Sequence, residues 1–328
     1  SKGCCNMKAI SVVGERVEWT EHDDPRPGPG EVLIRVRATA VNRADLLQRA
    51  GAYPVPPGAS PILGLECAGE IQSIGSGVTR CAIGDPVCAL LSGGGYAEQV
   101  VVPEGQVLPI PDGLDFVKAA AIPEVFATAW LNLYREGGLT PGERVLLHAG
   151  ASGVGTAAIQ LCRVFGNPCF VTAGSSEKIA ACAALGAAGG SVRGEESFLE
   201  AIGSWTDGQG VDVILDSVGG AYLADNLQSL SLDGRLVMIG LLGGMESPVN
   251  LGLLLMKRLR IIGSTLRSQS DAAKTALMGD LQEKLWPLFA CGDIIPVIDS
   301  VFSIEEADKG QQWVSGNQTV GKVILTVG

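Results

Sequence analysis

The stretch from Glu143 to Gly166 constrains the fold more than any other part of this sequence. It begins with the apolar run 145–147, passes through a turn of small residues, and continues with apolar residues at helical spacing. A strand, a glycine turn and a helix in this order form the first unit of a dinucleotide-binding βαβ fold. The glycines let the backbone approach a pyrophosphate, and free N–H groups at the helix start favour its negative charge.

The residues of this turn that we expect to contact a dinucleotide are Gly150, Ser152, Gly153, Val154 and Gly155. Their spacing, Gly150-x-x-Gly153-x-Gly155, differs from the standard G-x-G-x-x-G pattern. A glycine turn that joins a strand to a helix and binds nothing is therefore an alternative. Ser152 could contact the nicotinamide side of the ligand or simply cap the helix.

Strands alternate with helices from about residue 128 to residue 266, which is typical of a parallel sheet covered on both faces. Six parallel strands make a complete doubly wound domain. The candidate strands are 144–148, 169–173, 190–192, 211–216, 235–239 and 259–263.

The segments on either side have a different pattern. From Lys8 to about Pro123, short strands are separated by Gly/Pro turns, as in an antiparallel β domain, and we expect residues 115–135 to be helical. After residue 266 we expect a helix at 271–290, a strand at 297–302, a capping box at 303–306 and a last strand at 322–327. Because this tail must pack somewhere, we expect residues 1–127 and 267–328 to form one domain and residues 128–266 to form the other.

Composition narrows the possible functions. With 328 residues the chain is long enough for two domains, and its net charge of -11 argues against a nucleic-acid surface. No apolar run reaches the roughly 18 residues that span a bilayer, so we expect no membrane segment. Nine cysteines without a C-x-x-C pair favour a reducing, cytoplasmic compartment. Residues 1–6 lack the apolar core of a signal peptide, and we expect them to be an extension without a role.

The order of several short motifs resembles the zinc-independent quinone oxidoreductases of the medium-chain dehydrogenase/reductase superfamily. The resemblance covers nearly the whole chain and is nearest to the p53-inducible quinone oxidoreductase type. It implies a GroES-like catalytic domain split around a Rossmann domain, NADPH as the hydride donor, and quinones as substrates. The motifs that carry it are Ala40–Asp45, Tyr53–Ala59, Gly64–Glu66, Gly84–Val87, Pro103–Gly105, His148–Gly155, Asp216–Gly219, Gly234–Val237 and Leu266–Ser268.

Zinc dehydrogenases of this superfamily carry a catalytic Cys, a Gly-His-Glu motif and a separate four-cysteine lobe. Here the corresponding positions are Asn42 and Leu65, and the lobe region from Leu90 to Val100 has no Cys. Zinc needs a tetrahedral set of N, S or O ligands, which these residues do not supply. We therefore predict no metal and a carbonyl group polarised by hydrogen bonds, which suits quinones and enones.

Cofactor choice depends on the end of the second Rossmann strand, where NAD enzymes place an acid and NADP enzymes need positive charge. Here Gly174 and Ser175 are neutral, Lys178 lies one step into the helix, and Arg193 could add a second charge. The alternative is that Ser175 only caps the helix and Lys178 is a solvated charge. We predict NADPH, with Glu177 facing solvent.

The remaining site candidates lie near the acceptor or along the nicotinamide. Tyr53 could stack on a flat ring or donate its O–H, although an ordinary anchoring tyrosine fits equally well. Asn42 would bind cofactor or substrate through its amide, while Asp45 more plausibly orients neighbours. We interpret His148 as structural. Further expected cofactor contacts, some of them suggested by the resemblance, are Ser217, Gly240, Leu266, Arg267, Asn317 and Lys322.

Three alternatives stay open. A 2-alkenal or enone reductase would share the fold and NADPH, and a non-catalytic, crystallin-like nucleotide-binding protein would keep only the fold. The third is a regulatory or partner-binding role through a dimer. The resemblance implies a homodimer that continues the Rossmann sheet across a two-fold axis, for which the apolar segment Leu236–Leu242 could serve. A buried strand would give that segment the same sequence.

Overall fold

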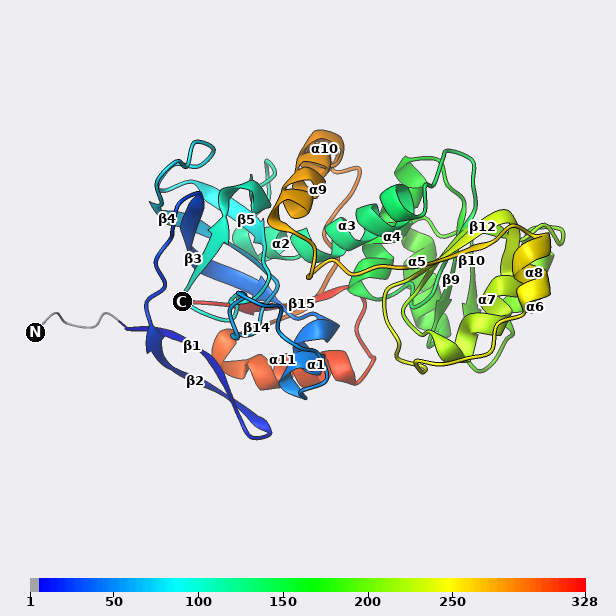
Figure 1. Cartoon of the computed structure of the whole chain (residues 1–328), viewed down its shortest axis with the longest axis horizontal. Helices are drawn as coiled ribbons and strands as arrows, with labels where there is room; N and C mark the ends of the chain where they lie inside the picture. Colours follow the sequence, from blue (N-terminus) through cyan, green and yellow to red (C-terminus); the bar gives the residue numbers. More distant parts are fainter. Residues whose placement is uncertain (1–5) are drawn as a thin grey trace, which may run out of the picture. The chain divides into compact units, whose positions relative to one another are not determined.

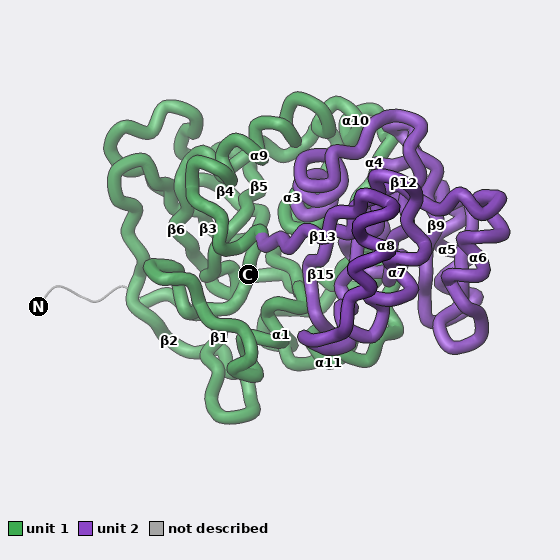
Figure 2. Tube along the Cα trace, turned by 45° about the vertical axis from the view of Figure 1, so that its right-hand side comes forward, with its two compact units in different colours: residues 1–127, 266–328 green, residues 128–265 purple. Residues whose placement is uncertain are grey.

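The computed structural model describes residues 6–328, so residues 1–5 of the expected N-terminal extension lie outside the described residues. The chain divides into two units (Figure 2). Unit 1 combines the chain up to Ala127 with Leu266–Gly328, and unit 2 is Thr128–Thr265. Unit 1 is therefore built from two segments that are distant in sequence.

Unit 2 contains a six-stranded sheet in which every pair of neighbouring strands is parallel. Its order, β10-β9-β8-β11-β12-β13, places the glycine turn after a central strand, where a doubly wound sheet binds its ligand. The prediction of a parallel, Rossmann-like sheet is confirmed. The strands are β8 Val145–Leu147, β9 Cys169–Ala173, β10 Gly189–Val192, β11 Val211–Asp216, β12 Leu230–Met238 and β13 Arg260–Gly263.

Helices cover both faces of this sheet (Figure 1). On one face, α6, α7 and α8 pack over a cluster that includes Leu146, Ile214 and Leu236, one residue from each of three central strands. On the other face, α4 and α5 contact each other and the strands that precede them. The helices of unit 2 are a π-helix at Leu131–Glu136, α4 Gly153–Val164, α5 Ser176–Leu185, α6 Phe198–Trp205, a 3-10 turn at Gly220–Tyr222, α7 Leu223–Ser229 and α8 Leu251–Met256.

Unit 1 is mainly antiparallel. Its large sheet has the order β14-β15-β3-β4-β5-β7, with β6 paired to β3, and only the β14–β15 pair is parallel. A separate hairpin joins β1 and β2. The strands are β1 Asn6–Val13, β2 Arg16–Asp23, β3 Glu31–Ala40, β4 Glu66–Ile74, β5 Pro86–Leu90, β6 Gln99–Pro103, β7 Val107–Pro109, β14 Ile298–Ser303 and β15 Lys322–Thr326.

The C-terminal segment supplies β15, which pairs with β3, so the tail completes the sheet that the N-terminal segment begins. The GroES-like part of the predicted fold class is confirmed together with the Rossmann part. The helices of unit 1 are α1 Arg43–Arg49, a 3-10 turn at Glu104–Gln106, α2 Phe116–Ala120, α3 Pro123–Trp130, which runs past the unit boundary, α9 Asp271–Lys284, α10 Trp286–Cys291, a 3-10 turn at Ile304–Glu306 and α11 Ala307–Ser315.

Two predicted helices are interrupted by proline. The expected helix at 271–290 is two helices, α9 and α10, because Pro287 lies in the first turn of α10, where its missing N–H costs nothing. The expected helical segment at 115–135 likewise breaks before Pro123 and ends as a π-helix. Periodicity alone predicted these segments as continuous.

Two other local predictions hold only in part. At the expected capping box, the Ser303 side chain makes no hydrogen bond to the helix backbone and instead contacts the Glu306 carboxylate at 3.3 Å. In the expected dimer segment, Leu236 and Val237 are buried inside the sheet, because β13 pairs with β12 and forms the edge. Leu241 and Leu242, at the other end of the segment, are exposed, at 45% and 58%.

Candidate functional site

The glycine turn of unit 2 presents the start of α4 as an anion site. Ser152 caps the helix, its Oγ accepting the N–H of Gly155 at 3.1 Å. The N–H groups of Gly153 and Val154 have no acceptor within the helix, because that acceptor would lie before the helix begins. They stand at the positive end of a 12-residue helix, which favours phosphate.

Two glycines of this turn are required by close backbone approach. A Cβ at Gly155 would lie 2.5 Å from the carbonyl oxygens of both Ala149 and Gly150. A Cβ at Gly150 would lie 2.6 Å from Cβ of Val171 on β9. The glycine at position 150 is therefore explained by packing of the turn on the sheet, while Gly155 is needed for the turn itself.

Three of the predicted cofactor residues meet at the end of β9. The Arg193 guanidinium lies close over Gly174, since a Cβ there would be 3.3 Å from Nη2 of the arginine. The Ser175 side chain caps α5, because its oxygen accepts a hydrogen bond from the N–H of Lys178 at 3.2 Å. This is the helix-cap role that we gave as the alternative. The hydroxyl group can still donate its own hydrogen to a ligand. Glu177 is exposed on α5, as expected.

A cavity of about 250 Å³ in unit 2 adjoins this cation. Arg193 and Thr172 line it together with the aromatic rings of Phe198 and Tyr222, whose centroids are 5.2 Å apart. Burial raises the pKa of Tyr222, and Arg193 opposes that shift. Flat aromatic rings next to a positive charge can bind a nucleotide base and a phosphate group.

His148 uses both ring nitrogens inside unit 2. Nε2 donates to Oδ1 of Asn226 at 2.7 Å, since an amide oxygen can only accept. Nδ1 then accepts from the Thr172 hydroxyl at 3.0 Å. Burial lowers the pKa of the ring, which stays neutral. This geometry fits the structural interpretation of His148.

Ser217 and Gly240 lie next to each other after β11 and β12. A Cβ at Gly240 would be 2.9 Å from the carbonyl oxygen of Ser217. The buried Asp216 carboxylate fixes this loop by accepting the N–H groups of Val218 at 2.9 Å and Gly219 at 2.8 Å. Both predicted residues therefore stand at the carboxyl ends of parallel strands, where ligands bind in such sheets.

In unit 1, Asn42 belongs to a buried ionic cluster. Its Nδ2 donates to Oε2 of Glu66 at 2.7 Å, and its Oδ1 accepts from Nζ of Lys322 at 2.7 Å. Lys322 also donates to Glu66 at 2.9 Å and to the Val41 carbonyl at 3.2 Å. The three N–H groups of Lys322 are thus matched by three acceptors within the cluster, which argues against the expected cofactor contact of this lysine.

Asp45 orients the same region. Its carboxylate accepts the N–H groups of Asn42 at 2.8 Å and Gly64 at 3.0 Å, and the hydroxyl of Tyr96 at 3.3 Å. Burial raises the pKa of Asp45 to about 6, with both N–H groups opposing the rise. Every contact runs to a neighbouring backbone or side chain, so Asp45 holds α1 against β4.

Tyr53 and Arg267 form the second polar group of unit 1. The guanidinium lies over the tyrosine ring, 5.3 Å from its centroid. Nε of Arg267 donates to the Ser92 carbonyl at 2.9 Å, whereas Nη1 and Nη2 are buried without a partner in the described chain. Arg267 is only 5% exposed, so two donors are buried and available to a ligand.

Two charged residues near this pair escaped the sequence analysis. Lys274 is buried on α9, donating to Oγ of Ser92 at 2.5 Å and to the Arg267 carbonyl at 2.7 Å. Glu124 begins α3, and its N–H donates to Oε1 of Glu66 at 3.1 Å. The signal for Glu124 was a single acid inside the apolar run 119–127.

The other two predicted cofactor residues of unit 1 differ in their surroundings. Leu266 is buried next to Arg267. Asn317 lies in an exposed turn with a positive φ of 55°, and its amide oxygen accepts from the Arg43 guanidinium. The Asn317 side-chain oxygen therefore already accepts a hydrogen bond within unit 1.

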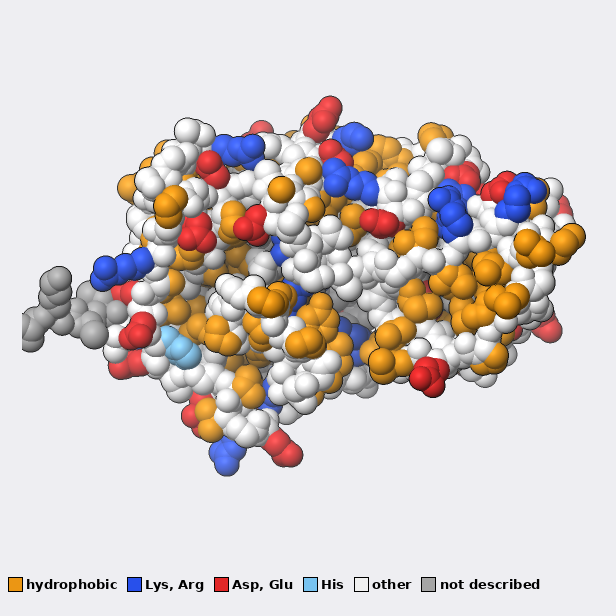
Figure 3. Space-filling view, viewed as in Figure 1, with side chains coloured by type: hydrophobic (Ala, Val, Ile, Leu, Met, Phe, Trp, Pro, Cys, Tyr) orange, Lys and Arg blue, Asp and Glu red, His pale blue; other side chains and the backbone are white. Residues whose placement is uncertain are grey.

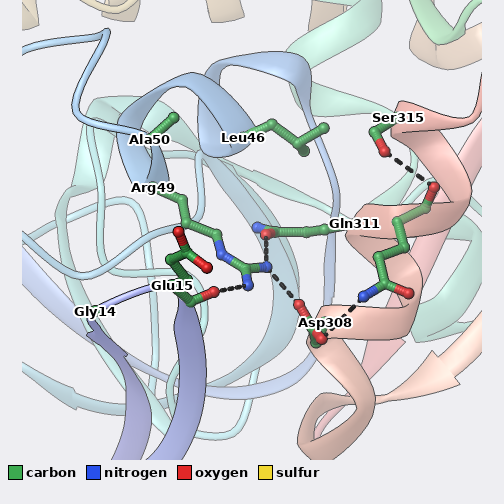
Figure 4. A pocket seen from close by; sticks show the side chains of 9 residues that line it. Gly14, Glu15, Leu46, Arg49, Ala50, Asp308, Gln311 and Ser315 are labelled. Carbon is green, nitrogen blue, oxygen red and sulfur yellow. Dashed lines mark hydrogen bonds and ion pairs between the residues drawn. The ribbon is translucent and has the colours of Figure 1, made fainter.

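A depression of about 560 Å³ in unit 1 is lined by other residues, among them Arg49, Asp308 and Gln311. Figure 4 shows Arg49 of α1 pointing between the β1–β2 turn and α11. Its guanidinium donates to the Glu15 carbonyl at 2.6 Å and to Gln311 at 2.9 Å, and pairs with Asp308 at 2.6 Å. Arg49 thus ties three elements together, and its donors are used in doing so.

Residues 6–328 lack two kinds of feature. No three His, Cys, Asp or Glu side chains in that range come together as a metal site. None of its helices combines the length and apolar character needed to cross a bilayer.

Comparison with known proteins identifies the family. Residues 28–112 match the alcohol dehydrogenase GroES-like domain, and residues 153–279 match the zinc-binding dehydrogenase domain. A quinone oxidoreductase of Pseudomonas aeruginosa is 34% identical over 314 residues, 95% of either chain. The chain belongs to the medium-chain dehydrogenase/reductase superfamily. The predicted membership of this superfamily is confirmed.

Solved structures agree with this medium-chain dehydrogenase/reductase assignment. A quinone oxidoreductase of Pseudomonas syringae superimposes with a TM-score of 0.87 at 31% identity, covering 98% of this chain and all of that one. The CurK enoyl reductase gives 0.86 at 29% identity, covering 98% and 99%. A mycobacterial protein complexed with NADPH gives 0.87 at 26% identity, covering 98% and 100%. The chain is therefore an oxidoreductase of this superfamily with a fold that binds a nicotinamide cofactor.

Proposed function

We propose that this protein is an NADPH-dependent quinone reductase that works without a metal ion. The observation that carries the proposal is the pair of the half-buried Tyr53 and the buried Arg267, a flat cation on a flat ring with two donors left for an acceptor. A quinone is planar and presents carbonyl oxygens, so it can stack on such a pair and accept hydrogen bonds from it. The quinone oxidoreductases among the relatives support the same substrate class.

NADPH fits the residues of unit 2. The start of α4 would hold the pyrophosphate through Gly153 and Val154, and Arg193 with the Ser175 hydroxyl would hold a 2′-phosphate. The bound cofactor supplies a hydride, and the chain's residues orient the acceptor and stabilise its oxygens. The mycobacterial neighbour complexed with NADPH supports this choice.

The absence of metal chemistry follows from the residues at the corresponding positions. Asn42 shares its amide between Glu66 and Lys322, and Leu65 is buried. The charged groups beside Asn42 are therefore the Lys322 ammonium and the Glu66 carboxylate, which pair with each other at 2.9 Å. Hydrogen-bond donors such as Arg267 would stabilise the oxygen on which negative charge develops.

The second candidate function is reduction of a 2-alkenal or enone. The enoyl reductase among the structural neighbours favours it, and the same donors could hold an enone carbonyl.

We propose further that the enzyme acts in the cytoplasm, where its seven described cysteines would remain free thiols.

A substrate panel separates these functions. Purified protein would be tested for NADPH and NADH oxidation with 1,2-naphthoquinone, benzoquinone and a 2-alkenal. The proposal expects rapid NADPH consumption with the quinones. Rapid turnover of the alkenal alone would establish the second candidate, and no consumption with any acceptor would favour a non-catalytic nucleotide-binding protein.

We also propose a homodimer formed through unit 2. Strand β13 is the open edge of the sheet, and large apolar side chains stand exposed on and before the neighbouring helix α8. Figure 3 shows hydrophobic side chains gathered over the α7–α8 side of this unit. The most exposed are Met245 at 83%, Leu251 at 69%, Leu255 at 75% and Met256 at 75%. An edge strand and an apolar surface of this kind favour association with a second copy.

A further inference from the structure

Lys274 is a charged residue on the apolar face of α9. The other buried residues of this helix are Leu277, Met278 and Leu281, which follow it at the spacing of one helix face. Lys274 is only 1% exposed, so its ammonium group is removed from water together with these apolar side chains. Burying an ammonium group is costly unless hydrogen bonds compensate for the lost water. Its contacts therefore have to explain why α9 carries a charge at this position.

The ammonium group connects two other residues of unit 1. Nζ of Lys274 donates to Oγ of Ser92 at 2.5 Å and to the main-chain carbonyl of Arg267 at 2.7 Å. Arg267 in turn donates from Nε to the main-chain carbonyl of Ser92 at 2.9 Å. The three residues form a closed set of hydrogen bonds, the Ser92–Arg267–Lys274 triangle. It joins α9, the segment just before α9 and the loop that follows β5.

Ser92 is a fixed corner of this triangle, because the loop that follows it is closely packed. The N–H of Gly94 donates to the Ile62 carbonyl at 2.8 Å. A Cβ at Gly93 would lie 2.5 Å from the carbonyl oxygen of Ser60, so the two backbones approach too closely for a side chain. The loop therefore holds Ser92 against the segment that precedes β4.

The triangle limits how the Arg267 side chain can turn. An arginine side chain has several rotatable bonds, and its guanidinium group keeps one orientation only where contacts hold it. Here Lys274 binds both sides of the Nε contact, the Arg267 main chain and Ser92. The guanidinium group lies over the Tyr53 ring, 5.3 Å from its centroid, and its buried Nη1 and Nη2 atoms have no partner in the described chain. The direction of these two donors thus depends on the triangle.

We propose that Lys274 is a positioning residue of the acceptor site and acts through Arg267. Its ammonium group keeps the guanidinium on Tyr53, so that Nη1 and Nη2 are already oriented when an acceptor binds. Donors that need no reorientation stabilise developing charge better than mobile ones. The inference rests on the proposed quinone reductase function and adds a residue to it.

The first test measures the orientation of Arg267 without cofactor or substrate. In proton–nitrogen NMR spectra of arginine-labelled protein, the Arg267 Nε–H resonance is identified by its loss in Arg267→Met. Its hydrogen should exchange slowly with water in the wild type, because it is buried and bound to the Ser92 carbonyl. We expect Lys274→Met to accelerate this exchange at least about tenfold. Lys284→Met, the same change at an exposed position of α9, should leave the exchange rate unchanged.

The second test measures catalysis with NADPH and 1,2-naphthoquinone in a double-mutant cycle. Lys274→Met should lower kcat/KM about tenfold in the wild-type background, mainly through kcat, while Kd for NADPH stays within about twofold. In an Arg267→Met background there is no guanidinium group to orient, so Lys274→Met should change kcat/KM by less than about twofold. A residue that only stabilised the fold would lower kcat/KM in both backgrounds.

The outcomes separate this inference from the proposed function. Unchanged hydrogen exchange at Arg267 in Lys274→Met, or equal losses of kcat/KM in both backgrounds, would overturn the role of Lys274 even if the protein reduces quinones. If the wild-type protein reduces no quinone, the proposed function fails and the role in catalysis fails with it. The exchange measurement then still shows whether Lys274 orients Arg267.

If Lys274→Met does not fold, Ser92→Ala takes its place in both tests, because it removes the hydroxyl group that Nζ of Lys274 binds. Faster exchange at Arg267, with a loss of kcat/KM only where the guanidinium group is present, would support the proposal. A wild-type exchange rate in Ser92→Ala, or the same loss of kcat/KM with and without the guanidinium group, would contradict it.

Discussion

Arg267 is the residue whose surroundings most need an explanation. An arginine with only 5% of its surface exposed would normally have acceptors for all its donors, yet two of its nitrogens have none within the described chain. Burial lowers its pKa, and the Tyr53 ring and nearby acids oppose that shift. An acceptor that binds there would remove this deficit, and we take that acceptor to be the carbonyl oxygen of the substrate.

We predict that Arg267→Lys lowers kcat/KM for quinones about tenfold. An ammonium group keeps the charge but loses the flat stack on Tyr53 and the fixed pair of donors, at a cost of about 1.4 kcal/mol. The check is steady-state kinetics with 1,2-naphthoquinone, with the exposed Arg80→Lys as the matched control. An unchanged KM and kcat in Arg267→Lys would show that the guanidinium does not contact the acceptor.

At the scale of single elements, the turn between β8 and α4 is the feature that depends most on one residue. A side chain at position 155 would overlap two carbonyl oxygens at 2.5 Å, and the start of α4 would have to move. Gly203 on α6 has open space where its Cβ would be, so it offers a matched control.

We predict that Gly155→Ala weakens NADPH binding at least tenfold, and that Gly203→Ala leaves it unchanged. The first change displaces the N–H groups that would hold the pyrophosphate, whereas the second adds a helix-favouring residue worth about 0.5–1 kcal/mol. Titration of NADPH fluorescence measures both. Wild-type affinity in Gly155→Ala would contradict the proposed phosphate site.

Glu143 and Arg235 stabilise the end of the central sheet in unit 2. The pair is bidentate, with both N–O distances at 2.9 Å, and Arg235 also donates to the carbonyls of Gly137 and Gly138. Hydrogen bonds from Arg235 lower the pKa of Glu143 to about 2, from 4.5 in an unfolded chain. The stabilisation is therefore complete above pH 4.5 and is lost as the pH falls through about 2.

We predict that Glu143→Gln lowers the free energy of unfolding by about 2–3 kcal/mol at pH 7, because a buried arginine loses its charge partner. The difference between variant and wild type should shrink as the pH falls from 4.5 toward 2. Urea unfolding at several pH values measures it. A difference in the free energy of unfolding that stays constant over this pH range would mean that ionisation of Glu143 does not contribute to stability.

Particular residues show how far the sequence could predict the structure. The pattern of apolar residues identified the strands of unit 2, because parallel strands that are buried on both faces are continuous apolar runs. It missed the break before Pro287, where a local backbone constraint outweighs the helical pattern. It also missed Glu124 and Lys274, because their neighbours come from segments that lie far apart in sequence.

The whole molecule adds a question of assembly. The exposed apolar side chains around α8 lie beside the open edge at β13, whereas the segment first expected to pair, Leu236–Leu242, is partly inside the sheet. The sequence could not show whether Leu236–Leu242 lies inside the sheet or at a dimer interface, since an interior strand and an interface strand are equally apolar.

We predict that the protein sediments at twice its chain mass of 33.9 kDa and that Met256→Glu makes it monomeric. A charge there would be buried without a partner in the dimer. Ile83→Glu, at an equally exposed apolar position of unit 1, should leave the dimer intact. Sedimentation velocity measures all three, and a monomeric wild type would exclude the proposed dimer.

The central claim is that reduced nicotinamide bound by unit 2 reduces a quinone with hydrogen-bond donors in place of a metal. The most direct measurement is single-turnover oxidation of NADPH by 1,2-naphthoquinone, followed by stopped flow in protein stripped with a chelator. We predict fast oxidation at a rate that added zinc leaves unchanged. An inactive stripped protein that zinc restores would contradict the claim.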